Sequence, residues 1–287
     1  MTTQISVEDL KALLDRQAVK VVDGSIEPAV KVVDGSWALD GTDMRSLYLQ
    51  NHIPGAQFFD LEAVSDHSTH LPHMAPSPQQ FVAAVGKLGI SQTDHVVVYD
   101  RQGLFSAARV WWTFKVMGHA RVQVLSGGLP AWKAAGFATE AGVAEVKDAV
   151  YVADFREDMV IGLDEVRTLD GRFIVLDARS LARFEGTAPE PRAGLRSGHI
   201  PGSRSLPFGE LIRDGGLKPV DELRAIFAER GVTENARVVT SCGSGVTAAI
   251  LSMALSEIGH AQDLLYDGSW AEWGQDTLDT PVVTGPA

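Results

Sequence analysis

A single cysteine is the strongest nucleophile that the sequence offers. Cys242 is the only cysteine among 287 residues, so the chain can form neither an internal disulfide nor a metal site with several cysteine ligands. Residues 238–241 before it are mostly apolar, which predicts a short buried strand. Side chains at the carboxyl end of such a strand lie where α/β sheets bind ligands. A lone cysteine can equally be a small buried apolar residue, and the residues that follow distinguish the two cases.

The segment after Cys242 predicts a loop that stabilises an anion. Gly243 and Gly245 permit backbone angles that let successive N–H groups turn inward. A helix predicted from Val246 to Ile258 adds its free N–H groups and the positive end of its dipole. Surroundings of this kind favour the thiolate, the reactive form of cysteine, over the thiol. We therefore expect a ring of main-chain amides around the sulfur of Cys242.

The elements that position this loop occur twice in the chain. The segment HIPG at 52–55 recurs at 199–202, and VVVYD at 96–100 matches VVTSC at 238–242. A third landmark, a glycine followed by a tryptophan, keeps the same order in both halves. Matching landmarks in one order indicate a duplicated domain. We predict a first domain at 1–140, a linker at 141–157 and a second domain at 158–287.

Each half alternates short apolar runs with helical patterns. Runs of Val, Ile and Leu without polar alternation are typical of strands covered on both faces. The alternation predicts an α/β fold in which each half has a mostly parallel sheet flanked by helices. Strands are expected at 32–34, 95–99, 122–125, 173–177, 238–241 and 263–266. Helices are expected after a Ser6 cap and at 78–88, 106–117, 131–135, 221–230 and 246–258.

One short segment is copied in the first half. The letters KVVDGS stand at 20–25 and again at 31–36. The second copy aligns with the strand that ends at Asp177, so it is predicted to be the core strand. The first copy is expected to form an inserted loop or an extra edge strand.

The charge of the chain excludes two classes of partner. Lys and Arg number 25 against 37 Asp and Glu, which gives a net charge of −12. Such a chain repels nucleic acids and anionic membranes, and no basic cluster offsets this. No apolar run approaches the roughly 20 residues of a membrane span. Because the first residues show no basic stretch followed by an apolar core, we expect a cytoplasmic protein. We also expect that an acidic chain with two domains works as a monomer.

The loop CGSGVTA at 242–248, the two-domain repeat and both HIPG segments resemble the rhodanese superfamily, and within it the enzymes that take sulfur from 3-mercaptopyruvate. The resemblance covers nearly the whole chain. It implies two tandem rhodanese-like domains. The first would be inactive, because Asp100 stands where the second has Cys242.

The resemblance also implies a reaction in two steps. Cys242 would attack the sulfur of 3-mercaptopyruvate, leaving pyruvate and a persulfide on the enzyme. An acceptor would then remove the outer sulfur; the family uses thiols, thioredoxin or cyanide. Neither a metal nor an organic cofactor is needed for this chemistry.

Roles for other side chains follow from the same resemblance. Arg183 and Arg192 match the two arginines that hold the substrate carboxylate and carbonyl, which suits the planar fork of a guanidinium. Ser244 and His73 match two members of a proton relay, and Glu62 stands where relatives often have Asp. The loop residues expected to contact the substrate are Gly243, Gly245, Val246 and Thr247.

Some of these residues also have a plain structural interpretation. Ser244 could be a turn residue that bonds its own backbone, and His73 a structural histidine. The two arginines could be solvent-exposed surface charges. Asp60 and Asp66 lie close to Glu62 and compete with it for the acidic place in the relay.

Further conspicuous residues are interpreted as structural. His52 and His199 precede Ile-Pro-Gly in both halves, including the inactive one, so we predict that they serve turns and packing. The segment 266–270 follows a predicted strand and could border the site, but a structural role is favoured for it as well. Arg179 and Arg196 are weaker candidates for substrate binding.

Three rival functions remain to be compared. The first is a thiosulfate sulfurtransferase of the same fold, but thiosulfate carries two charges and Gly243 and Ser244 are neutral. The second is a phosphatase, which needs an arginine six residues after the cysteine, where this chain has Ala248. The third is a non-catalytic module that carries a persulfide or binds proteins. An intact cysteine loop with two arginines argues against this third function.

Overall fold

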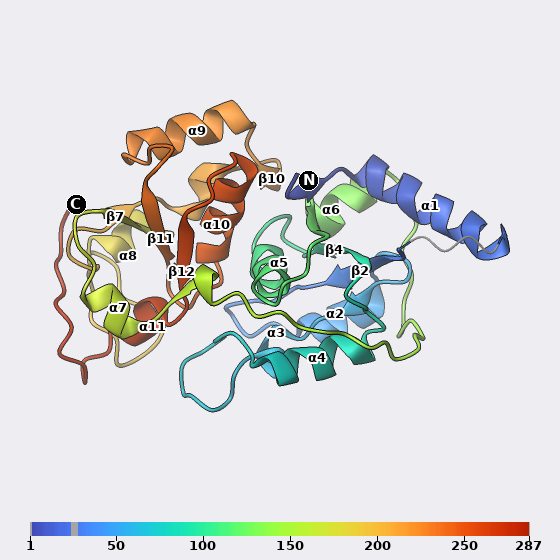
Figure 1. Cartoon of the computed structure of the whole chain (residues 1–287), viewed down its shortest axis with the longest axis horizontal. Helices are drawn as coiled ribbons and strands as arrows, with labels where there is room; N and C mark the ends of the chain where they lie inside the picture. The colour runs from blue at the N-terminus through green and yellow to red at the C-terminus, as the bar shows by residue number, and fades with distance from the viewer. Residues whose placement is uncertain (1, 24–27, 287) are drawn as a thin grey trace. The chain divides into compact units, whose positions relative to one another are not determined.

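The computed structural model describes residues 2–23 and 28–286, which form two compact units (Figure 1). The first unit comprises Met1–Val64, Pro76–Arg156 and Arg213–Leu217. The second comprises Ser65–Ala75, Glu157–Ile212 and Lys218–Ala287. The short segment Ser65–Ala75, which carries His73, therefore belongs to the same unit as Cys242.

The first unit is built on a five-stranded parallel sheet in the order β1-β5-β4-β2-β3. The central strand β4 is buried at every residue, as expected for an apolar run without polar alternation. The strands are β1 Gln4–Ile5, β2 Val30–Asp34, β3 Gln57–Phe58, β4 His95–Tyr99 and β5 Val122–Leu125.

Helices flank this sheet, and α5 packs against β4 and β5. The predicted Ser6 cap is confirmed, because its Oγ accepts the N–H of Asp9 at 3.0 Å. Ser77 and Gln80 form a reciprocal capping box at the start of α4. The helices are α1 Val7–Asp23, α2 Met44–Gln50, α3 Leu61–Val64, α4 Pro78–Lys87, α5 Ala107–Val116 and α6 Gly128–Ala134.

The second unit repeats the same architecture. Its parallel sheet has the order β6-β12-β11-β7-β8, so each strand has a counterpart at the same place in the first sheet. The predicted α/β fold, with a mostly parallel sheet in each half, is confirmed. The strands of this sheet are β6 Val160–Ile161, β7 Phe173–Asp177, β8 Arg204–Ser205, β11 Arg237–Ser241 and β12 Asp263–Tyr266. A separate two-stranded sheet consists of β9 Ile212–Arg213 and β10 Gly216–Leu217, and its residues 213–217 belong to the first unit.

Helix α10 is the most deeply buried helix element of the second unit. All residues from Ala248 to Leu255 are buried, and the helix packs on β11 and β12. Apart from Ser252 the segment is apolar, which is typical of a helix covered on every side. The other helices are α7 Leu163–Arg167, α8 Leu181–Phe184, α9 Val220–Glu229 and α11 Ser269–Trp273, with 3-10 turns at Glu157–Met159 and Phe208–Leu211.

The two HIPG histidines have the packing role predicted for them. His52 is fully buried, its Nδ1 lies 2.9 Å from the carbonyl of Tyr48, and its ring stacks on that tyrosine. His199 repeats the pattern, with Nδ1 2.8 Å from the carbonyl of Phe184 and the two rings stacked.

The prediction for the first KVVDGS copy is wrong. Lys20–Asp23 ends helix α1 instead of forming an inserted loop or an edge strand, while the second copy forms part of β2. The next two residues of the first copy lie outside the described residues. Identical letters thus form helix in one place and strand in another. The reason is tertiary: the second copy pairs with β4, whereas the first continues a helix already begun at Val7.

Candidate functional site

Cys242 follows directly on β11 and carries a free, buried thiol with 2% exposure. The helix after it begins at Ala248, two residues later than predicted, so Val246 and Thr247 belong to the loop. Gly245 has a φ of +76°, a left-handed conformation that a side chain would strain. The loop therefore has the length and the glycine that a sharp turn from strand to helix requires.

Ser269 braces this loop from the segment after β12. Its Oγ accepts the N–H groups of Cys242 and Gly245, both at 3.2 Å, and donates to the carbonyl of Tyr266 at 2.8 Å. The N–H of Trp270 also reaches the carbonyl of Cys242 at 3.0 Å. Ser269 itself has a φ of +49°, in the left-handed region where non-glycine residues are uncommon.

The hydrogen bonds of Ser269 differ from the predicted ring of main-chain amides around the sulfur of Cys242. Two of the loop amides point at the Ser269 hydroxyl, and within the described part of the chain no hydrogen bond to the Cys242 sulfur is formed. The segment 266–270, for which the sequence favours a structural role over bordering the site, supports the loop directly. Nothing in the local sequence marks Ser269 for this role, because its partners lie 24 and 27 residues away.

The equivalent loop of the first unit shows what such amides can do. Asp100 follows β4 as Cys242 follows β11, and its buried carboxylate accepts the N–H groups of Gln102, Phe105 and Ala107 at 2.7–2.9 Å. Burial raises the pKa of Asp100, and these amide hydrogen bonds oppose the rise. A loop of this kind can therefore hold an anion by its main chain.

The Cys242 loop keeps main-chain donors available for such an anion. Among the described residues, the N–H groups of four loop residues find no hydrogen-bond acceptor. These residues are Gly243, Ser244, Val246 and Thr247.

His73 and Ser244 lie together in the second unit. The Nδ1 of His73 is 3.0 Å from the Oγ of Ser244, and both side chains are buried. The backbone of His73 has a φ of +61°, so the loop is bent sharply where it presents this ring. Two of the three side chains expected in the relay are therefore within hydrogen-bond distance.

The loop that carries His73 is fastened at further points. Asp267 accepts the N–H of Ala75 at 2.6 Å, and the Nε2 atoms of His70 and Gln275 are 3.2 Å apart. Asp267 directly follows β12, so the same sheet edge supports both Cys242 and the His73 loop.

Glu62, the expected acidic partner, belongs to helix α3 of the first unit. Its Oε1 accepts the indole N–H of Trp37 at 2.8 Å.

Arg183 lies against the Cys242 loop. One of its terminal nitrogens, Nη2, is 3.0 Å from the point that a Cβ on Gly243 would occupy, so a side chain at that position would press on the guanidinium. Arg183 is held by Glu190, which accepts from Nε at 3.2 Å and from Nη2 at 2.5 Å. Arg192 is half-buried in the same connection between α8 and β8.

The two weaker arginine candidates are fully engaged in structure. Arg179 is buried, pairs with Asp177 and Glu190, and stacks 4.2 Å from the ring centroid of Trp270. Burial disfavours its charge, yet the two carboxylates raise the pKa of Arg179 above its ordinary value. Arg196 donates to the carbonyls of residues 273 and 280.

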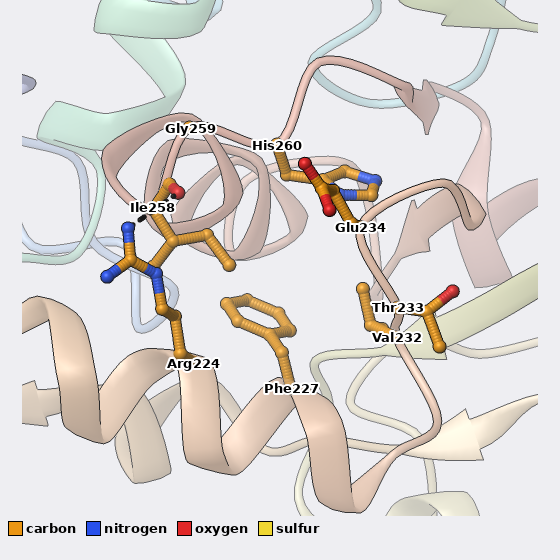
Figure 2. A pocket seen from close by; sticks show the side chains of 8 residues that line it. All are labelled: Arg224, Phe227, Val232, Thr233, Glu234, Ile258, Gly259 and His260. Atoms are coloured by element: carbon orange, nitrogen blue, oxygen red, sulfur yellow. Dashed lines mark hydrogen bonds between the residues drawn. The ribbon is translucent and has the colours of Figure 1, made fainter.

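A separate pocket lies at the other end of the second unit. This cavity of about 340 Å³ lies beside the carboxyl ends of α9 and α10, whereas Cys242 precedes the amino end of α10; Figure 2 shows the side chains that line it. Phe227, Val232 and Ile258 form its apolar part, and Arg224 donates to the carbonyl of Ile258 at 3.4 Å. Glu234 and His260 complete the polar rim.

Two further searches bear on the kind of site. Within residues 2–23 and 28–286, no three His, Cys, Asp or Glu side chains come together in a group that could hold a metal ion. In the same ranges, no helix combines the length and the apolar character needed to cross a membrane.

A sequence model of the rhodanese-like domain matches residues 6–135 and 163–276. The chain belongs to the rhodanese family. The 3-mercaptopyruvate sulfurtransferase of Escherichia coli K12 is 42% identical to this rhodanese over 261 residues, which span 89% of this chain and 92% of that protein. The human 3-mercaptopyruvate sulfurtransferase is 38% identical over 89% of this chain and 88% of its own length.

Solved structures give the same family and fold. This rhodanese matches the crystal structure of SseA from Escherichia coli with a TM-score of 0.81 and 38% identity, over 95% of this chain and all of that one. That structure is described as a 3-mercaptopyruvate sulfotransferase with the "Rhodanese" fold. Tum1 from Saccharomyces cerevisiae matches with a TM-score of 0.85 and 29% identity, over 100% of this chain and 99% of Tum1.

Proposed function

We propose that this rhodanese is a 3-mercaptopyruvate sulfurtransferase that carries sulfur as a persulfide on Cys242. The observation that supports this most directly is the grouping of Cys242, the Ser244–His73 pair and Arg183 around one loop of the second unit. The names of the two relatives described above specify the same sulfur donor, and the similarity extends over about nine tenths of each relative's length.

The first step forms a sulfur–sulfur bond and breaks a carbon–sulfur bond. The Cys242 thiolate attacks the sulfur of 3-mercaptopyruvate, and the electron pair of the broken bond passes to carbon as the enolate of pyruvate. One proton then converts this enolate to pyruvate. The sulfur keeps its own hydrogen and remains on the enzyme as a persulfide.

Each group of side chains at the site has a separate role in this first step. Arg183 and Arg192 hold the carboxylate and carbonyl of the donor through guanidinium hydrogen bonds. Ser244, hydrogen-bonded to His73, delivers the proton to the enolate. The four free amides of the loop receive the negative charge on sulfur; they belong to Gly243, Ser244, Val246 and Thr247. Gly245 allows the turn that presents them.

In the second step a nucleophilic acceptor removes the outer sulfur and restores the thiolate. We propose a thiol, including the thiol of thioredoxin, or cyanide as acceptor, and a monomer as the working unit. Neither step requires a metal or an organic cofactor.

Thiosulfate is the second candidate donor. Two relatives from Arabidopsis thaliana, 41% and 42% identical, are named thiosulfate/3-mercaptopyruvate sulfurtransferases, which favours testing both donors. The neutral residues after Cys242 favour the donor with one carboxylate over the dianion.

The intact mass of the protein after brief exposure to 3-mercaptopyruvate tests the proposal. We expect one added sulfur, about 32 Da, which a thiol or cyanide removes. The Cys242→Ser variant should fold normally and gain no mass, since a hydroxyl is a far weaker nucleophile. Turnover retained by Cys242→Ser, or no added sulfur on the wild type, would overturn the proposal.

A further inference from the structure

Glu190 is a buried carboxylate between two arginines beside the Cys242 loop. Its side chain is 2% exposed, and it accepts from Arg179 Nη1 at 2.7 Å as well as from Nε and Nη2 of Arg183. No sequence motif marks Glu190 as a functional residue. A fully buried carboxylate with two cationic partners is costly to keep unless its position matters.

The edge of Arg183 that Glu190 occupies determines which edge remains free. A guanidinium offers two forks for a carboxylate, one formed by Nε and a terminal nitrogen, the other by the two terminal nitrogens. Glu190 takes the first fork. Among the described residues, Nη1 of Arg183 has no acceptor, and the side chain keeps 22% exposure. The second fork is therefore available to a ligand next to Gly243.

Glu190 also balances the charge behind the loop. Asp177, Arg179, Glu190 and Arg183 form one chain of ion pairs with two negative and two positive charges. Without the charge of Glu190, this group would carry one net positive charge. An added positive charge attracts a dianion more strongly than a monoanion at the same distance.

We infer that Glu190 is a positioning and specificity residue for the sulfur donor, acting through Arg183; this inference rests on the function proposed above. It holds the guanidinium by one fork so that the other faces the single carboxylate of 3-mercaptopyruvate. Its own charge keeps the site unfavourable for dianionic thiosulfate. Orientation and charge are separate effects, and different variants of the same residue distinguish them.

The experiment compares Glu190→Gln with Glu190→Asp, measuring kcat and KM for both donors. Glu190→Gln removes the charge and weakens the fork. We expect KM for 3-mercaptopyruvate to rise about tenfold and the preference to move about tenfold toward thiosulfate. Glu190→Asp keeps the charge but is one methylene shorter, so KM for 3-mercaptopyruvate should rise while the preference stays near that of the wild type.

The matched control is Glu210→Gln, which removes the carboxylate of another arginine pair of the second unit, with Arg230. It should leave both donors unchanged. Near-ultraviolet circular dichroism of each variant reports whether it is folded. If Glu190→Gln does not fold, Glu190→Asp and Arg183→Lys carry the test, because both keep the charge and lose the fork. Both should raise KM for 3-mercaptopyruvate and leave kcat and the donor preference near the wild-type values, whereas a purely structural role would lower kcat as well.

One result in folded Glu190→Gln overturns the inference alone: an unchanged donor preference, with an equal fall for both donors, as a purely structural role would give. If Glu190→Gln does not fold, an unchanged KM for 3-mercaptopyruvate in both Glu190→Asp and Arg183→Lys also overturns the inference. A wild-type protein that takes sulfur from neither donor would instead overturn the proposed function.

Discussion

Cys242 and Asp100 stand at the same place in two loops built on the same plan. The carboxylate of Asp100 receives three main-chain amides, so its loop is already occupied by an anion of its own. The Cys242 loop holds no such anion and leaves four amides free among the described residues. At the scale of single residues, this exchange of aspartate for cysteine separates a closed loop from one that can receive charge.

The contact between Ser244 and His73 yields a prediction about donor chemistry. The enolate left by 3-mercaptopyruvate needs a proton, whereas sulfite leaves thiosulfate as a stable anion. Ser244→Ala should therefore lower kcat for 3-mercaptopyruvate about 100-fold and affect thiosulfate much less. Steady-state rates with both donors measure this. Ser256→Ala, an exposed serine of α10, is the control, and equal losses for the two donors would remove Ser244 from the proton relay.

At the scale of elements, the loop depends on its neighbours along the sheet edge. The turn after β12 supplies Ser269, which holds two amides of the Cys242 loop, and Asp267, which holds the His73 loop. Loops at the carboxyl ends of two adjacent strands thus stabilise each other. The reactive sulfur depends on this arrangement for its position.

Ser269→Ala tests the brace. The substitution leaves the N–H groups of Cys242 and Gly245 without their acceptor, and a buried unsatisfied amide costs about 1–3 kcal/mol. We expect a lower free energy of unfolding and slower persulfide formation, measured by urea titration and by intact mass over time. Should both quantities match the wild type, the loop does not need the hydroxyl.

At the scale of the whole molecule, the same sheet is built twice and used differently. Both sheets have equivalent strand orders, and both place a helix after the central strand. The second unit has exchanged the fixed anion for a thiol and has gained the His73 loop among its own contacts. The shared fold provides the frame, and a few side chains provide the difference in chemistry.

A partly buried carboxylate of the second sheet makes the free energy of unfolding depend on pH. Burial raises the pKa of Asp263 in β12 from 3.8 to about 6, with a hydrogen bond from Ser252 opposing it. Because the folded state disfavours the charged form, Asp263 costs nothing below pH 3.8. Its cost grows as pH rises to about 6 and then stays constant, at up to about 3 kcal/mol.

Asp263→Asn removes this cost. The variant should be more stable than the wild type at pH 7.5, and the gain should vanish near pH 4. Urea unfolding at both values measures it. Asp279→Asn, at an exposed position, serves as the control, and a gain that is equal at both pH values would contradict the assigned cause.

The fold class could be predicted from the sequence alone, and the sequence also marked Cys242 as the candidate nucleophile. Apolar runs such as 95–99 and 173–177 form strands because their composition suits burial on both faces, and the glycines after Cys242 mark a turn through local backbone freedom. These signals lie within a few residues of each other. They can be detected without knowing what packs against them.

The remaining features could be known only from the folded chain, because each of them depends on contacts with residues that are distant in sequence. The two copies of KVVD differ only in their neighbours, and one became helix and the other strand. Ser269 braces a loop more than 20 residues away, and the segment with His73 joined the unit that contains Ser244. Local periodicity says which face of an element is buried. It does not say which distant side chain will lie opposite, and these contacts decide how the site is held.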